Sequence, residues 1–173
     1  MGNTSGFPSS SFKFQTELNI KDYNLSQERN DQRFGHIYVM RSKNSSKNVL
    51  VKERPVTERP DELIRRLEVS NDYLLKIFNA KEIPGTGSYQ VYFEDFATDL
   101  NSEIRRHLAE KTRFPEGELY AILYCTISAL SALEQKGIAH ENINPTNILK
   151  QSREVYKIHD NYLLSAHNTI YQQ

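Results

Sequence analysis

The segment His140–Lys150 reads His-Glu-Asn-Ile-Asn-Pro-Thr-Asn-Ile-Leu-Lys and decides the fold prediction. Just before it, apolar residues recur at helical spacing through 116–136, and the next residue, Gly137, is typical of a helix C-cap. The last residues of the segment are β-rich, and Asp160 follows Asn147 by thirteen residues. The sequence therefore predicts a long helix, a polar loop and a strand in that order.

The rest of the chain predicts an α+β fold. Runs rich in β-branched and aromatic residues predict strands at 34–40, 49–51, 73–78, 89–96, 148–150 and 155–158. Pro60 and Asp61 are typical of a helix start, and the apolar residues after them predict a helix through Leu67. The polar turn at 44–47 predicts a hairpin between the first two strands, and 84–87 carries a second strong turn signal.

These elements and the polar loop resemble a protein kinase. The catalytic loop of that family reads His-Arg-Asp-Leu-x-x-x-x-Asn, and its metal-binding loop begins Asp-Phe-Gly. This chain has His140, Asn147 and Asp160 at the matching positions. The resemblance implies a small antiparallel-sheet lobe with one helix, followed by the first part of a helical large lobe.

The same resemblance divides the chain into three parts. Residues 1–20 are expected to be a disordered leader, because the first of them are small and polar. Residues 21–96 correspond to the small lobe, and 97–173 to a partial large lobe that ends just after the metal-binding loop. We expect a degenerate, C-terminally truncated relative of serine/threonine kinases, which is either part of a longer protein or completed by a partner.

The position of the catalytic base is changed. Kinases place an aspartate there to accept the substrate proton, whereas this chain has Asn142, a neutral amide. Losing a general base typically lowers the rate by ~10²–10⁴. Asn144 stands where related kinases have a basic residue. Asn147 and Asp160 keep the positions of the magnesium ligands; alternatively, Asn147 braces the loop backbone and Asp160 caps a turn. The resemblance therefore implies a pseudokinase without phosphoryl transfer.

The phosphate-binding loop is also altered. Residues 30–37 align with the family pattern G-x-G-x-x-G-x-V, but only the third glycine remains, as Gly35. Asn30 and Gln32 carry side chains at positions where the backbone amides of a kinase approach the phosphates closely.

Lys52 matches the strand lysine that pairs with the nucleotide phosphates in kinases. Its expected partner is Glu62 on the following helix, with Glu58 as the second candidate, and a solvated glutamate is the alternative for either. Leu50 would crowd the adenine base. Phe93, at the gatekeeper position, would narrow the pocket or pack in the core. We therefore expect no cofactor, with binding of ATP and magnesium as the alternative.

Composition and charge exclude several other classes. The 22 basic and 22 acidic residues leave no basic excess for nucleic-acid binding. No apolar run reaches the ~20 residues of a membrane span, and the histidines show no zinc-site spacing. The single cysteine, Cys125, lies on the apolar face of the long helix and predicts core packing and an intracellular location. Gly2 begins a near match to a myristoylation signal, so a weak lipid anchor is the alternative to a flexible leader.

The apolar stripe of 116–136 would normally pack against later helices of a kinase. Exposed, it marks an interaction site that a protein partner covers. The sequence thus predicts a catalytically inactive kinase-like module, which acts as an interaction scaffold or as a structural subunit of a larger assembly. A cytoplasmic, cytoskeletal or ciliary location fits this role. The alternatives are a nucleotide-binding regulatory pseudokinase and a fragment of an atypical active kinase.

Overall fold

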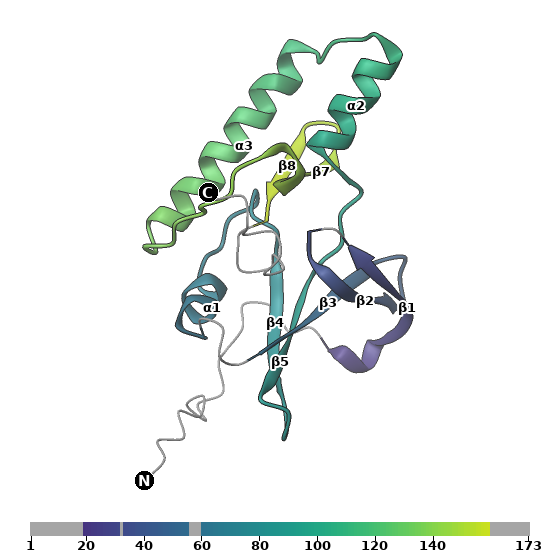
Figure 1. The fold of residues 1–173 in the computed structure, drawn as a ribbon, viewed down its shortest axis with the longest axis vertical. Helices are drawn as coiled ribbons and strands as arrows, with labels where there is room; N and C mark the ends of the chain where they lie inside the picture. The colour runs from purple at the N-terminus through teal and green to yellow at the C-terminus, as the bar shows by residue number, and fades with distance from the viewer. Residues whose placement is uncertain (1–18, 32, 56–59, 160–173) are drawn as a thin grey trace.

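The computed structural model describes residues 19–31, 33–55 and 60–159, except for the side chains of 60–63. Figure 1 shows a sheet-rich part, drawn below, and a helical part, drawn above. The elements run in the order η1 (Ile20–Asp22), β1 (Tyr23–Asp31), β2 (Gly35–Ser42), β3 (Asn48–Pro55), α1 (Pro60–Leu67), β4 (Ile77–Ile83), β5 (Ser88–Glu94), β6 (Thr98–Asp99), α2 (Leu100–Glu110), α3 (Glu116–Glu134), η2 (Pro145–Asn147), β7 (Ile148–Ser152) and β8 (Val155–Ile158). The fold is therefore mixed α+β with an antiparallel sheet and few helices, as predicted.

The larger sheet has the strand order β1-β2-β3-β5-β4, and all of its neighbouring strands are antiparallel. β2 and β3 form the predicted hairpin, in which Val39 lies opposite Leu50. Gly85 and Gly87 in the turn between β4 and β5 both have positive φ, a conformation that suits glycine. β1 was not predicted, because its side chains are mostly exposed and lack the alternation that marks a half-buried strand.

The predicted strand at 73–78 is wrong in its first half, since β4 begins at Ile77. The residues before β4 pair instead with the end of β8. The Ile158 amide donates to the Tyr73 carbonyl at 2.9 Å, and the Leu75 amide donates to the Ile158 carbonyl at 2.8 Å. Leu74 and Leu75 are buried at this junction, which explains an apolar composition that does not come from the larger sheet.

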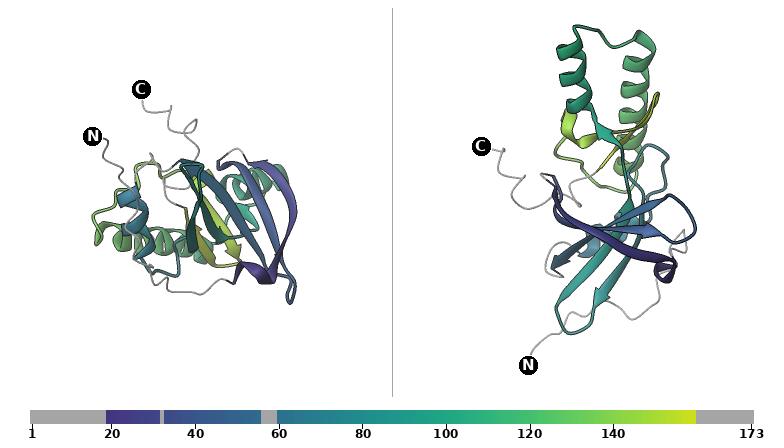
Figure 2. Two further views of the ribbon diagram at one scale, coloured as in Figure 1. Left: turned by 90° about the horizontal axis from the view of Figure 1, so that it is seen from below. Right: turned by 90° about the vertical axis from the view of Figure 1, so that its right-hand side faces the viewer.

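The helical part is built on the small sheet β6-β7-β8, and the views in Figure 2 show α2 and α3 side by side. The predicted long helix is confirmed as α3, whereas α2 was not predicted. α3 buries Cys125, Ala129 and Leu133, so the expected core packing of the cysteine is confirmed. Other members of its predicted stripe remain exposed, namely Leu119, Leu123 and Ile127.

Neither α3 nor any other helix in the described ranges has the length and apolar character that crossing a membrane requires. The expected lipid anchor at Gly2 and most of the expected leader lie outside the described residues.

Candidate functional site

The loop that follows α3 is held by His140. Its Nε2 lies 3.0 Å from the carbonyl oxygen of His159, and its Nδ1 lies 3.3 Å from the backbone nitrogen of Asn142. An amide can only donate here, so Nδ1 is the acceptor and Nε2 carries the proton that His159 accepts. Glu141, between His140 and Asn142, has a φ of 60°, and this left-handed backbone conformation bends the loop sharply there. His140 thereby connects the loop to the end of β8.

Asn142, at the position of the kinase base, is engaged by its neighbours. Its Oδ1 accepts a hydrogen bond from Asn144 Nδ2 at 2.7 Å, and Asn144 Oδ1 in turn accepts from the Thr146 amide at 2.9 Å. The Thr146 hydroxyl also donates to Asn144. These side chains form a chain of neutral groups, none of which can take up a proton near neutral pH.

Asn147 is 2% exposed and braces the loop from inside. Its Nδ2 donates to the Asn142 carbonyl at 2.8 Å, as the loop-bracing interpretation predicts. Asp160, its predicted partner in magnesium binding, lies outside the described residues, so the vestigial metal site stays a prediction. Within the residues that the structure describes, no three histidine, cysteine, aspartate or glutamate side chains gather as metal ligands would.

Phe34, in the turn before β2, packs between the larger sheet and the end of the small sheet. Its ring is 0% exposed and lies 5.3 Å from the ring of Phe93, 5.7 Å from that of Phe96 and 4.7 Å from that of His159. Phe34 also belongs to the buried cluster that contains Leu50 and Leu149. One apolar core therefore runs from β3 and β5 of the larger sheet to β7.

Arg33, beside Phe34, ties this turn to the helical part. Its Nη1 donates to Asp99 at 2.9 Å and to the Thr146 carbonyl at 3.3 Å, while Nε and Nη2 donate to Asp31 at 3.1 Å each. The guanidinium also lies 4.7 Å from the centre of the Phe96 ring, a cation–π distance. Asp99 has a second role as the N-cap of α2, where it accepts from the Ser102 amide.

Taken together, the contacts from Arg33 affect the pKa of the Asp31 carboxyl more than its burial does. Burial raises the pKa of this carboxyl, but the hydrogen bonds and the charge of Arg33 hold the pKa below its usual value. Asp31 also accepts hydrogen bonds from the backbone amides of Arg33 and Phe34, at 2.9 and 3.3 Å. These contacts hold the side chains of Arg33 and Phe34 inward.

The structure describes only some of the candidate nucleotide-binding residues. Lys52 is buried on β3, and the neighbouring Leu50 is fully enclosed by the core. Phe93 packs in that core, as one of the two interpretations of this residue predicts. Glu62 belongs to α1, but its side chain lies outside the described residues, and Glu58 and Gln32 lie wholly outside them. The predicted pairing of Lys52 with Glu62 therefore stays a prediction.

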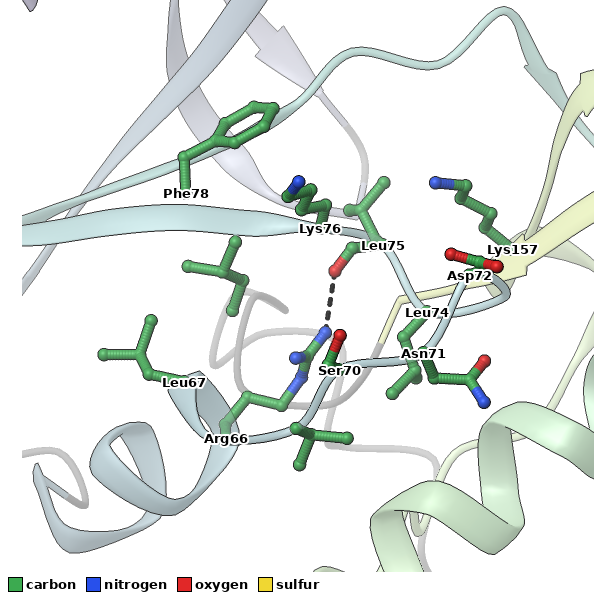
Figure 3. A pocket seen from close by; sticks show the side chains of 12 residues that line it. Arg66, Leu67, Ser70, Asn71, Asp72, Leu74, Leu75, Lys76, Phe78 and Lys157 are labelled. Carbon is green, nitrogen blue, oxygen red and sulfur yellow. Dashed lines mark hydrogen bonds between the residues drawn. The ribbon is translucent and has the colours of Figure 1, made fainter. Parts of the chain in front are cut away.

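A small cavity of about 100 Å³ lies between the end of α1 and the segment before β4 (Figure 3). Arg66 lines it and donates to the Leu75 carbonyl at 2.7 Å, which ties α1 to the start of β4. Lys157, also on the lining, is paired with Glu94 at 2.7 Å. Ligand pockets usually measure about 300–1,000 Å³, so this cavity is too small for a typical ligand. We therefore assign Arg66 the role of holding α1 in position.

A polar cluster joins α2, α3, β7 and β8. Lys150 Nζ donates to Glu103 at 2.6 Å and to Glu118 at 2.8 Å, and the Tyr156 hydroxyl donates to Glu118. The hydrogen bond from Lys150 is the main reason that the pKa of Glu103 is lowered. Burial raises the pKa of Glu118, but its bonds to Lys150 and Tyr156 hold the pKa below the usual value. Because each charge has a partner of opposite sign, the cluster is suited to holding these elements together.

Sequence reasoning missed Arg33, Phe34 and Asp99, which lie at the centre of the site. For Arg33 and Phe34, the available signal was that two large residues stand together just before Gly35. Asp99 carried a weaker signal, since an aspartate before an amphipathic stretch is a typical N-cap.

Comparisons with known proteins agree with a distant relationship to kinases. No family model matches the chain. The chain is 26% identical over 137 residues to inhibitor of nuclear factor kappa-B kinase subunit epsilon from Mus musculus, a match of 72% of this chain and 19% of the mouse protein. It is 21% identical over 148 residues to serine/threonine-protein kinase grp from Drosophila melanogaster, a match of 82% of this chain and 28% of that kinase. The chain thus spans less than a third of either relative, and the similarities suggest a kinase-like relationship.

Proposed function

We propose that this chain is a kinase-like module that transfers no phosphate and acts through contact with protein. The two relatives are named as kinases, which supports the kinase-like part of the proposal. The neutral chain Asn142–Asn144–Thr146 supports the loss of chemistry, because a kinase needs a carboxylate at the position of Asn142. The single cysteine, buried in the core, fits a location inside the cell.

The observation that carries the proposal is the burial of Phe34 beside Leu50 and Phe93. By the resemblance, adenine would lie next to Leu50, in the space that this ring fills. A nucleotide could enter only if Phe34 moved out, which would cost about 1.5–3 kcal/mol for exposing the side chain. The same movement would pull Arg33 away from Asp99 and leave the Asp99 carboxylate without that partner. In this proposal, the protein itself closes the nucleotide position.

Equilibrium binding of a fluorescent ATP analogue, with and without magnesium, tests this proposal. We expect no saturable binding by the wild-type chain. Phe34→Ala opens the space. Phe114→Ala serves as the control, because it removes a partly buried ring that packs against His107 in the helical part, away from the loop. Binding by Phe34→Ala alone would identify this ring as the obstruction. Saturable binding by the wild-type chain would contradict the proposal and favour a nucleotide-binding regulatory pseudokinase.

A further inference from the structure

One side of α3 presents a continuous apolar surface, called here the exposed α3 face. Its members recur at helical spacing and are 48–65% exposed: Leu119, Tyr120, Leu123, Tyr124 and Ile127. The sequence has no charged residue between Glu118 and Glu134. The face is also partly fixed in shape, because the Tyr124 ring packs edge-on against Tyr73 with 5.5 Å between the ring centres. A contiguous apolar surface of this kind is typical of a protein interface.

We propose that a second copy of this chain covers the exposed α3 face, with the two α3 helices antiparallel about a two-fold axis near Leu123. The inference rests on the proposed function, since it names the protein that the module contacts. A two-fold axis requires a surface that complements itself, and an uncharged face meets this requirement without bringing like charges together.

The area of the face matches what a modest dimer needs. With on the order of 200 Å² for a fully exposed side chain of this size, the five residues contribute on the order of 600 Å² per copy. Two copies would bury on the order of 1,200 Å², which reaches the lower limit of specific, stable interfaces. Such an area fits a dimer that dissociates and re-forms reversibly as the protein concentration changes.

The charges beyond the ends of the face favour the antiparallel arrangement. Arg113 lies ten residues before Leu123, and Glu134 lies eleven residues after it. Both side chains are exposed. Antiparallel helices would bring Arg113, in the connection just before α3, and Glu116 at the start of α3 toward Glu134 of the other copy, twice by symmetry, so that an arginine accompanies each pair of glutamates. Parallel helices would bring Glu134 toward Glu134, which is unfavourable.

Sedimentation velocity of the full chain over a wide concentration range measures the association. We expect a reversible monomer–dimer equilibrium for the wild type. Leu123→Glu should raise the dissociation constant by about a hundredfold or more, because two carboxylates would meet at the axis. Leu108→Glu is the matched control, since Leu108 is a 71% exposed leucine of α2 outside the face, and it should dimerise as the wild type does. Circular dichroism would check that each variant is folded.

Charge reversal tests the orientation. Arg113→Glu and Glu134→Arg should each weaken the dimer, and the double variant should recover it. A wild-type chain that stays monomeric at every concentration, or a dimer unaffected by Leu123→Glu, would overturn the proposal. In the monomeric case, protection of 119–127 from hydrogen exchange would show that another segment of the chain covers the face. A monomer that does not bind ATP would overturn the dimer and leave the proposed closure of the nucleotide position standing. A dimer that binds ATP would refute only that closure.

Discussion

Arg33 and Asp99 form an ion pair with 2.9 Å between Nη1 and Oδ2, and this pair joins the turn before β2 to the N-terminal cap of α2. The two residues are 66 positions apart in the sequence, and both side chains are 15% exposed. The pair therefore connects the sheet-rich part to the helical part on the side where Phe34 is buried.

Removing the arginine should loosen this connection. We expect Arg33→Ala to lower the free energy of unfolding by about 1.5–3 kcal/mol, because it leaves Asp31 and Asp99 without their charged donor. Lys136→Ala is the control, since it breaks the exposed ion pair with Glu68 and should cost less than about 1 kcal/mol. Urea unfolding measures both. Equal losses in the two variants would mean that the Arg33 contacts contribute no more than a surface pair.

Truncating Phe34 should be among the more damaging single changes. Phe34→Ala is expected to cost about 3–5 kcal/mol, because it empties a fully buried aromatic position. Phe34→Leu, which refills part of the space, should lose clearly less stability than Phe34→Ala. Thermal unfolding of the three proteins would rank them, and a Phe34→Ala melt close to that of the wild type would show that the ring does not fill the core.

Restoring the acidic side chain at the base position should not restore activity. Asp at position 142 could still accept the hydrogen bond from Asn144, so we expect Asn142→Asp to fold. In the proposal, Phe34 would still exclude nucleotide, and the basic residue expected near the transferred phosphate would still be replaced by Asn144. A radiolabelled phosphate-transfer assay with generic protein substrates should give no signal above that of the wild type. Transfer by Asn142→Asp would mean that only the base was missing.

Breaking the polar cluster at its centre should destabilise the helical part. Lys150→Met leaves Glu103 and Glu118 close together without the lysine. We expect Lys150→Met to lower the free energy of unfolding by about 2–4 kcal/mol. This is less than breaking a fully buried ion pair would cost, because 17% of the Lys150 side chain is exposed. Urea unfolding measures the loss. A variant as stable as the wild type would show that Arg106, which also contacts Glu103, compensates for the missing charge.

The same cluster predicts that stability falls in acid. The folded-state pKa values of Glu103 and Glu118 lie below the ordinary glutamate value of about 4.3, so unfolding takes up protons in the window between these values. Their contribution is fully present above about pH 4.3 and is lost as the pH falls through the folded-state values. Asp31 acts in the same direction, so the comparison with Lys150→Met isolates the cluster. Urea midpoints against pH should fall more steeply for the wild type than for Lys150→Met, and parallel curves would contradict the assignment.

The fold was predicted where local signals are strong. The β2–β3 hairpin has a polar turn between β-rich runs, and α3 has a long helical period with Gly137 close behind its end. β1 was missed because its side chains are mostly exposed and carry little apolar periodicity. α2 was missed because it is short and its apolar face has few residues, although an N-cap aspartate precedes it. The segment at 73–75 was misassigned because burial between two parts of a chain produces the same composition as a strand.

The site was predicted only where a motif fixes the backbone. His140, Asn142 and Asn147 lie within eight residues of each other, and the loop that they form follows from their spacing. Arg33, Phe34 and Asp99 meet through the tertiary fold, and no local pattern indicates whether a side chain in the turn before β2 points inward or outward. Their meeting is what the proposed closure of the nucleotide position depends on.

The measurement that tests the central claim most directly is a thermal-shift titration of the wild-type chain with ATP and magnesium. A cooperative melt whose midpoint does not move at any nucleotide concentration is the predicted result. In the proposal, Phe34 occupies the space that adenine would need, and only binding to the folded state would raise the midpoint. A saturable rise in the midpoint that Lys52→Ala or Asp160→Ala abolishes would contradict the claim.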